Sequence, residues 1–319
     1  MIASVKTSWT LRGIEFKNRV FTASGTFGYG DEVRDLCNVD ALGGVCTKSL
    51  SRRPRDGNPP SRIVETAGGM LNSIGLANIG VESFLQQKLP LLRTLKTRII
   101  ANIAASSVEE YCEVLDMLEP ESEISAYEIN VSCPNVKEGG LNFGTNCRKT
   151  AEITSTLRSH TTKPLIIKLT PNVTHVSEFA RAVEDAGADA VSLINTVIGM
   201  AVDIRSRKPR LSTVTGGLSG PAIKPIALAK VYETAQAVKI PIFGIGGIAT
   251  AEDALEFLLV GAAAVQVGTM NFVDPNTAAK IAGDMEDFFR LNDIADAQDF
   301  VGTLKADVGF SILQSWLSS

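Results

Sequence analysis

Residues 127–135 read YEINVSCPN, and this stretch is the starting point for both the fold and the chemistry of the chain. It begins as an apolar strand and ends in a polar turn that carries Asn130, Cys133 and Asn135. In barrels of alternating strands and helices, chemistry is carried by side chains at the C-terminal ends of strands. An amide donates and accepts hydrogen bonds, and a thiolate can act as a base. The stretch is therefore a candidate active-site segment, although a strand-end turn with an incidental cysteine would look the same.

Working outward from this stretch, apolar and amphipathic segments alternate along the chain. Two early strands are predicted at 19–22 and 43–47, with a short helix near 31–36 between them. Later strands are predicted at 98–103, 125–130, 164–169, 189–194, 241–245 and 263–267. Helices are predicted at 81–95, 107–118, 145–159, 176–186, 225–238, 251–259 and 276–290.

Strands that alternate with helices indicate parallel βαβ units, and eight such units predict a (β/α)8 TIM barrel. We expect one barrel domain over residues 1–319, with a small N-terminal hairpin at 8–22 and inserted loops at the C-terminal face. A doubly wound sheet is the alternative. No GxGxxG segment opens a helix after the first strand, which disfavours that alternative.

Composition limits the classes of function. The chain has 319 residues, is 45% hydrophobic and has a net charge of -4, which fits a large α/β domain and argues against nucleic acid as the main partner. Its five cysteines form no CxxC pair, so we expect no disulfide framework, no metal site and no iron–sulfur cluster in this chain. No signal peptide and no apolar run of about 18 residues is visible, so we expect a cytoplasmic protein without a membrane span.

The predicted strand ends share one chemical character, because each is polar or glycine after an apolar strand. In chain order they are Ser24, Lys48, Asn102, Asn130, Lys168, Asn195, Gly246-Gly247 and Gly268-Thr269. Such a set of donors and cations should bind an anionic ligand. The glycines of the last two ends suit a phosphate, although a close-packed turn would also need glycine. The two lysines are unusual at strand ends, unless they extend to the barrel rim.

Three inserted segments have open roles. The loop at 197–220 carries four basic residues (Arg205, Arg207, Lys208 and Arg210) and is either a solvated loop or a lid or docking element. The loop at 51–62 raises the same question. The loop at 134–144 follows Cys133 and is the better lid candidate, since closing over the base would exclude water. In the tail 291–319, Phe300, Leu304, Phe310 and Trp316 suggest helical packing against the barrel.

With Asn130–Asn135 and the run KEGG at 137–140, the sequence resembles the dihydroorotate dehydrogenases. The resemblance extends over roughly residues 8–290 and includes Lys48-Ser49, Asn72–Leu76, Asn195-Thr196, the segment 215–225 and the two glycine turns. Cysteine at position 133 resembles the class 1 enzymes. The wording NSIGLANIG and GGLSGPAIKP is similar to the class 1B catalytic subunit, with the fumarate-dependent class 1A as the alternative.

The resemblance implies oxidation of (S)-dihydroorotate to orotate in pyrimidine biosynthesis with FMN, Cys133 being the base and flavin N5 the hydride acceptor. The implied substrate-binding residues are Lys48, Asn72, Ser73, Ile74, Gly75, Leu76, Asn130, Asn135, Asn195 and Thr196. The implied FMN-binding residues are Ser24, Lys48, Ser49, Asn102, Asn130, Lys168, Ile194, Gly220, Gly246, Gly247, Gly268 and Thr269. Class 1B further implies a partner subunit with FAD and a [2Fe–2S] cluster that passes electrons to NAD+, and a homodimer of catalytic chains within a heterotetramer.

Two readings from other classes remain open on the residues alone. A phosphate-binding barrel that is a lyase or isomerase would keep the glycine turns but would need no flavin. A non-catalytic scaffold would use the barrel surface and would have no need of Cys133 or the strand-end lysines.

Overall fold

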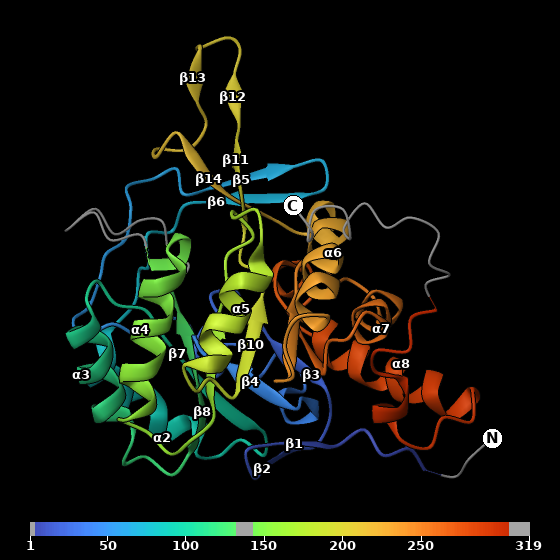
Figure 1. Cartoon of the computed structure of the whole chain (residues 1–319). Helices are drawn as coiled ribbons and strands as arrows, with labels where there is room; N and C mark the ends of the chain where they lie inside the picture. Colours follow the sequence, from blue (N-terminus) through green and yellow to red (C-terminus); the bar gives the residue numbers. More distant parts are fainter. Residues whose placement is uncertain (1–3, 132–142, 306–319) are drawn as a thin grey trace.

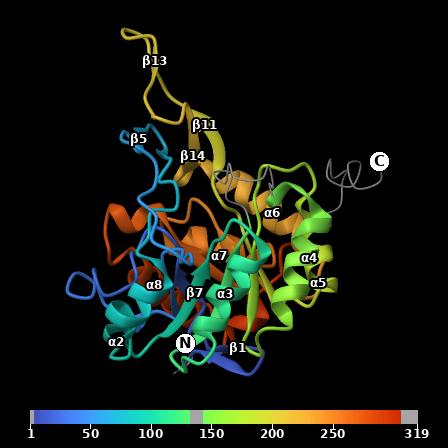
Figure 2. The same ribbon diagram turned by 90° about the vertical axis from the view of Figure 1, so that its left-hand side faces the viewer.

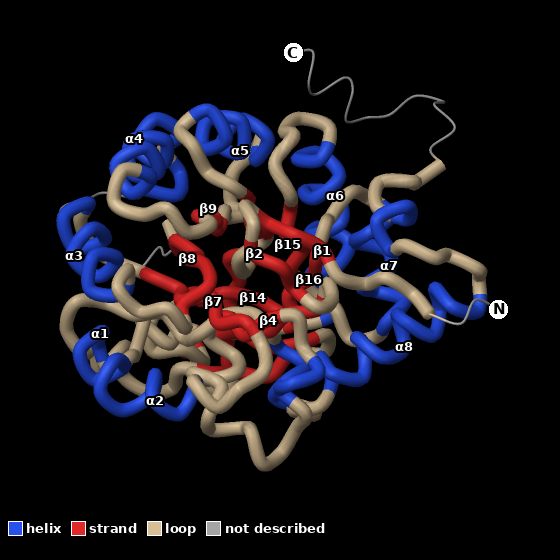
Figure 3. The backbone as a smooth tube through the Cα atoms, turned by 90° about the horizontal axis from the view of Figure 1, so that it is seen from below, coloured by secondary structure: helices blue, strands red, loops and turns tan. Residues whose placement is uncertain are grey.

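Eight apolar segments form parallel strands that close into a barrel at the centre of the molecule (Figures 1 and 3). The structure, a computed structural model, describes residues 4–131 and 143–305. The barrel strands are β3 (Val20–Thr22), β4 (Gly44–Cys46), β7 (Arg98–Ile103), β8 (Ile124–Asn130), β9 (Leu165–Lys168), β10 (Ala190–Leu193), β15 (Ile242–Ile245) and β16 (Ala264–Val267). Each pairs with the barrel strand before it, and β16 pairs back with β3, which confirms the predicted (β/α)8 barrel.

Helices form the outer layer around the strands, as the view along the barrel shows (Figure 3). They are α1 (Gly80–Ser83), a π-helical turn (Phe84–Lys88), α2 (Leu89–Leu92), α3 (Val108–Leu118), α4 (Cys147–Arg158), α5 (Val176–Asp185), α6 (Lys224–Ala235), α7 (Ala251–Leu259) and α8 (Thr277–Leu291). The first three form one run over residues 80–92, near the predicted helix 81–95. Side-chain caps fix several starts, such as the Thr250–Asp253 capping box of α7.

The predicted helix near residues 31–36 is wrong, because the described chain has turns there. The segment is too short to offset the cost of helix nucleation without further support. Its acidic side chains are held by contacts outside the segment instead. Lys88 pairs with both Asp31 and Glu32, and Glu32 also accepts a hydrogen bond from the N–H of Tyr29.

The predicted N-terminal hairpin is present and closes the lower end of the barrel (Figures 1 and 3). It consists of β1 (Trp9–Leu11) and β2 (Ile14–Phe16), which pair antiparallel. Trp9 and Phe16 stack on each other and meet Phe21 and Phe243 from inside the barrel. Burial of this aromatic group shields the N-terminal ends of the barrel strands from water.

A second sheet lies over the opposite end of the barrel, and the prediction of an unstructured loop at 197–220 is therefore wrong (Figures 1 and 2). Its antiparallel order is β11-β14-β6-β5, formed by β5 (Ile63–Thr66), β6 (Gly69–Asn72), β11 (Val197–Met200) and β14 (Thr215–Ser219). A hairpin of β12 (Val202–Asp203) and β13 (Lys208–Pro209) rises beyond it. The long insertion is thus ordered by pairing with a sheet formed by a distant segment.

The C-terminal part of the described chain packs beside α8. A short 3₁₀ turn at Ala297–Phe300 places Phe300 against Phe288 and Phe289, with ring centroids 5.7 and 5.5 Å apart. The expected packing is therefore present at Phe300, whereas Phe310 and Trp316 lie outside the described residues. Within residues 4–131 and 143–305, no helix has both the length and the apolar character needed to span a membrane.

Candidate active site

Lys168 ends β9, and its side chain turns into the barrel rather than out to the rim. Its ammonium donates a hydrogen bond to Oγ of Ser24, 3.1 Å away, and the side chain is 5% exposed. Ser24 follows β3, which lies opposite β9 in the eight-stranded order. The contact therefore spans the barrel and brings together two predicted cofactor-binding residues.

A buried carboxylate, Glu128, lies beneath this contact. It stands two residues before Asn130 on β8, so both side chains point to the same side of the strand, into the barrel. Oε1 of Glu128 lies 3.5 Å from Nζ of Lys168, and the Glu128 side chain has no exposed surface. The sequence prediction missed this residue. The signal was present, because a glutamate inside an apolar strand is rarely buried without a partner.

The carboxylate of Glu128 is fully committed to neighbouring side chains. Nδ2 of Asn102 donates to Oε1 at 2.7 Å, Nε2 of Gln266 donates to Oε2 at 2.8 Å, and Sγ of Cys46 donates to Oε1 at 3.2 Å. Burial alone would raise the pKa of Glu128, but the charge of Lys168 and these hydrogen bonds outweigh it and lower that pKa. Burial and the nearby Glu128 raise the pKa of the Cys46 thiol well above its ordinary value, so it is a neutral donor.

Ser49 and Asn102 form a second layer above the carboxylate. Oγ of Ser49 donates to Oδ1 of Asn102 at 2.6 Å, and Oγ1 of Thr47 accepts from the N–H of Asn102 at 3.1 Å. With its amide oxygen and nitrogen both engaged, Asn102 is held in one orientation. Two predicted cofactor-binding residues are thus joined directly to the Glu128 network.

Asn130, Asn195 and Thr196 come together at the ends of β8 and β10. Nδ2 of Asn195 lies 3.5 Å from Oδ1 of Asn130, and Oδ1 of Asn195 accepts from the N–H of Thr196 at 2.8 Å. The hydroxyl of Tyr111 donates to the carbonyl of Asn130. Asn172 donates to the carbonyl of Thr196 at 3.0 Å and fixes the start of the following segment, a role that the sequence prediction missed.

The predicted segment 72–76 enters the site from the second sheet. Nδ2 of Asn72 donates to the carbonyl of Gly217 at 3.3 Å, and Gly217 itself adjoins Thr196. Gly75 and Leu76 both have positive φ, at 74° and 58°, which turns the chain after Ile74. Oγ of Ser73 is buried and has no hydrogen-bond partner among the described residues.

Lys48 differs from Lys168, because its side chain is half-buried and has no ion pair among the described residues. Burial lowers the pKa of its ammonium, and nearby Arg62 acts in the same direction while Glu32 opposes it. A cation that is partly desolvated and not paired within the protein is suited to meet an anionic group.

The predicted phosphate end is formed by glycine turns after β14, β15 and β16. Gly220, Gly246 and Gly247 have positive φ, and a Cβ on Gly247 would lie 2.7 Å from the backbone nitrogen of Lys224. Close packing therefore already requires glycine at this turn, so both readings of it stand. Gly268 is different, because an added Cβ would approach nothing nearer than 3.5 Å. Beside it, the hydroxyl of Thr269 donates to Oγ of Ser219 at 2.8 Å.

Some predicted residues cannot be placed. Cys133 and Asn135 lie outside the described residues, as does the lid candidate 134–144 up to residue 142. Ile194 is buried at the end of β10, as expected for a residue beneath a ring. In the described part of the chain, no cluster of three or more acidic, histidine or cysteine side chains could hold a metal ion.

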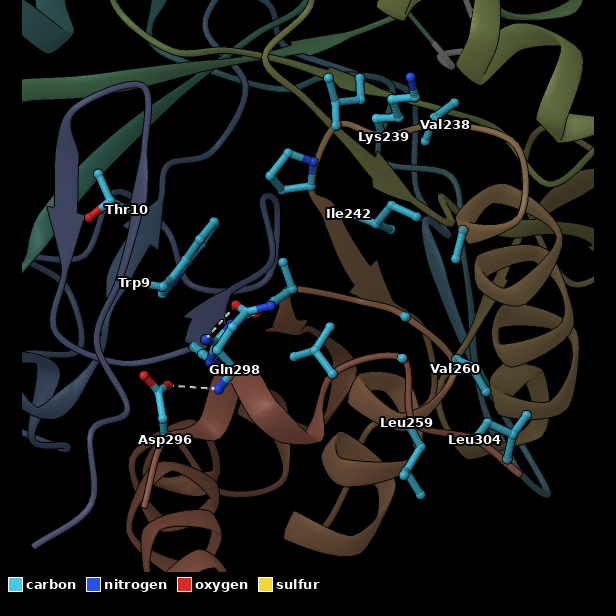
Figure 4. A pocket seen from close by; sticks show the side chains of 18 of the residues that line it. Trp9, Thr10, Val238, Lys239, Ile242, Leu259, Val260, Asp296, Gln298 and Leu304 are labelled. Atoms are coloured by element: carbon cyan, nitrogen blue, oxygen red, sulfur yellow. Dashed lines mark hydrogen bonds between the residues drawn. The ribbon is translucent and has the colours of Figure 1, made fainter. Parts of the chain in front are cut away.

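A separate hollow of about 880 Å³ lies at the other end of the barrel (Figure 4). Trp9, Lys239, Asp296 and Gln298 surround it, and it borders residues that precede β3, β15 and β16. The buried guanidinium of Arg19 donates there to the carbonyl of Ala263 and to Oε1 of Gln298. The polar strand ends face away from this hollow, so it is not part of the candidate site.

Known proteins give a consistent comparison. A family model described as dihydroorotate dehydrogenase matches residues 6–289. A relative from Geotalea uraniireducens, named "Dihydroorotate dehydrogenase B (NAD(+)), catalytic subunit", is 56% identical over 292 residues, which is 92% of this chain and 96% of the relative. A relative of the same name from Geotalea daltonii is 52% identical over 95% of this chain and 100% of its own length.

Among solved structures, a crystal structure of DHODH in complex with ferulenol from Eimeria tenella is similar, with a TM-score of 0.79. The match covers 93% of this chain and 88% of that chain at 22% identity. At this identity the likeness shows the fold alone, and it agrees with the closed barrel described above.

Proposed function

This chain belongs to the dihydroorotate dehydrogenase family and is an oxidoreductase, and we propose that it is the FMN-containing catalytic subunit of a class 1B enzyme. Its reaction is the oxidation of (S)-dihydroorotate to orotate in pyrimidine biosynthesis. The observation that carries the proposal is the 56% identity, over 92% of the chain, to a relative named as an NAD(+)-linked catalytic subunit. Fumarate as the acceptor and a flavin-free lyase or isomerase are not favoured by this match.

The described residues fit a flavin at the C-terminal end of the barrel. Gly25 and Gly268 leave open space beside the strand ends, since an added Cβ would meet nothing within 4 Å and nothing nearer than 3.5 Å respectively. Lys168 and Ser24 would hold the ring, together with Ser49, Asn102, Asn130, Lys48 and Ile194. Gly220, Gly246, Gly247, Gly268 and Thr269 would surround the phosphate, where main-chain N–H groups suit an anion.

The substrate would lie against the amide cluster. Asn72, Asn130, Asn135 and Asn195 would pair with the alternating C=O and N–H groups of its ring, with Thr196 adding a hydroxyl. Lys48, Ser73, Ile74 and the N–H groups of Gly75 and Leu76 would hold its carboxylate. Cys133 would remove the proton from C5, and bound FMN supplies the acceptor for the hydride that leaves C6.

Electrons would leave through a partner subunit that carries FAD and a [2Fe–2S] cluster and reduces NAD+. We propose a homodimer of catalytic chains that joins two such partners in a heterotetramer in the cytoplasm. Exposed apolar side chains on the β11–β14 insertion, among them Met200, Val202 and Ile204, support burial of this surface against another chain.

The test is anaerobic mixing of the purified chain with dihydroorotate while the flavin absorbance is followed. Rapid bleaching is expected, and NAD+ reduction should then require the partner subunit while fumarate alone restores little absorbance. A colourless chain that does not take up added FMN would overturn the flavin assignment. Flavin that stays oxidised in the presence of both dihydroorotate and the partner would overturn the substrate assignment.

A further inference from the structure

Glu128 lies at the centre of the barrel and is contacted from many sides. Its donors and its cation come from β4, β7, β9 and β16, so half of the eight barrel strands meet at one carboxylate. A buried carboxylate is costly unless it is paired and hydrogen-bonded. Such a group is expected to have a purpose that an apolar residue could not fulfil.

The arrangement holds Lys168 in one place. The ammonium is fixed between the carboxylate of Glu128 below, 3.5 Å away, and the hydroxyl of Ser24 across the barrel, 3.1 Å away. The Lys168 side chain is 5% exposed, so solvent does little to stabilise its charge. The negative charge of Glu128 is therefore the main stabilising partner of this cation among the described residues.

We propose that Glu128 is a positioning residue, which keeps Lys168 charged and aimed at the ligand end of the barrel, and that FMN binding depends on Glu128 through Lys168. The proposal rests on the proposed function, since it takes FMN as the ligand of this site. Glu128 itself lies below the layer of Ser49 and Asn102, and it acts on the ligand through its neighbours.

Loss of the carboxylate has a predictable signature. In Glu128→Gln the ammonium would be a buried charge without its counterion, and burial disfavours the charged form. It would then lose its proton as the pH rises, and the flavin would lose the cation. The groups that face the pair are Cys46 on β4, which is a neutral donor, and the non-titrating side chains of Asn102, Gln266, Ser24 and Ser192. No other titrating neighbour obscures the effect among the described residues.

The experiment measures FMN release from the holoenzyme. FMN-loaded chain is diluted at pH values from 6 to 9.5, and free FMN is measured by its fluorescence. The ratio of the variant's dissociation constant to that of the wild type removes the titration of FMN itself. In Glu128→Gln this ratio should rise by about tenfold or more between the two ends of the range, because a buried cation without its counterion is lost with rising pH.

Two matched variants separate positioning from structure. The step should disappear in the double variant Glu128→Gln/Lys168→Met, in which no ammonium remains to titrate. Glu233→Gln removes another buried carboxylate, which pairs with Lys230 and Ser177 on the outer helices, and should give a flat ratio. Glu128→Asp keeps the charge and should show a smaller step, which also serves if Glu128→Gln does not fold.

The outcomes are distinct. A flat ratio for Glu128→Gln, or for Glu128→Asp if that alone folds, together with normal binding by the wild type, would overturn this inference alone. A step that persists in the double variant would also overturn it. Failure of the wild-type chain to hold FMN would instead count against the proposed function.

Discussion

Gly217 on β14 packs directly against Thr196, so that a Cβ added to Gly217 would lie 2.0 Å from Oγ1 of Thr196. The second sheet is thereby joined to the amide cluster at the end of β10. In Gly217→Ala we expect Thr196 and the adjoining Asn195 to shift. Because small displacements of a substrate-positioning group are costly, the KM for dihydroorotate should rise by roughly 10- to 100-fold while FMN is retained.

The matched control for this change is Gly283→Ala on the exposed side of α8. An added Cβ there would meet nothing within 4 Å, and alanine in a helix interior is favoured over glycine by about 1 kcal/mol. This variant should be slightly more stable and should have unchanged kinetics. A Gly217→Ala enzyme with the KM of the wild type would show that Thr196 does not position the substrate.

Cys133 is proposed as the base that takes the C5 proton. Cys133→Ala should slow flavin reduction roughly 10²–10⁴-fold, which is the usual contribution of a positioned general base, and should leave FMN bound. Cys133→Ser should also be slow at neutral pH, because a hydroxyl is a far weaker acid than a thiol with an ordinary pKa of about 8.5. Stopped-flow bleaching from pH 6 to 10 measures both.

Cys112→Ala on α3 serves as the control for thiol removal and should behave as the wild type. Rates in the wild type should rise with pH until the thiolate dominates. Rapid bleaching by Cys133→Ala at high pH would exclude this residue as the base.

Much of the barrel could be predicted because its strands are short apolar runs between helices with regular apolar spacing. The second sheet could not, because β6 and β14 pair across more than a hundred residues, for example Asn72 with Gly217. Glycines in β14 also lower its strand propensity, yet Gly216 and Gly217 are needed where this strand passes Asn72 and Thr196. Local sequence carries no record of such a distant pairing.

The candidate site was predictable to a similar degree. Polar strand ends such as Lys168 and Asn102 stand out after apolar runs. Glu128 was treated as part of an apolar strand, because its value lies in donors from strands that are distant in sequence. Its interior position follows from its spacing of two from Asn130, and this was the available signal.

Asp253 links stability to pH at the start of α7. It accepts hydrogen bonds from the N–H groups of Ala249 and Thr250 and pairs with Lys224 at 2.6 Å. Burial alone would raise the pKa of Asp253, but Lys224 and these N–H groups outweigh it and hold the pKa below its ordinary value. Its stabilising effect is therefore present above an unfolded pKa of about 3.9 and is lost as the pH falls through the lower folded value.

Asp253→Asn should accordingly lower the free energy of unfolding by about 1 kcal/mol at pH 7, allowing for the partial exposure of the pair. The difference from the wild type should shrink below about pH 4, where the wild-type carboxylate also becomes neutral. Urea unfolding at several pH values measures this, with Asp284→Asn on α8 as the control. A difference that stays constant down to pH 2 would show that the charge of Asp253 is not involved.

The hairpin of β12 and β13 is the surface on which the proposed homodimer can be tested. Ile204 is 87% exposed, and Met200 and Val202 are about half-exposed, on an element that stands away from the barrel (Figures 1 and 2). Contiguous apolar side chains on a protruding element are typical of an interface. Met200→Lys combined with Ile204→Lys should convert dimer to monomer in sedimentation velocity, because two unpaired charges would have to be desolvated on association. Val273→Lys, at a site that is 73% exposed outside the hairpin, should leave the dimer intact. A dimer that persists in the hairpin variant would place the contact between catalytic chains elsewhere and leave the hairpin to the electron-transfer partner.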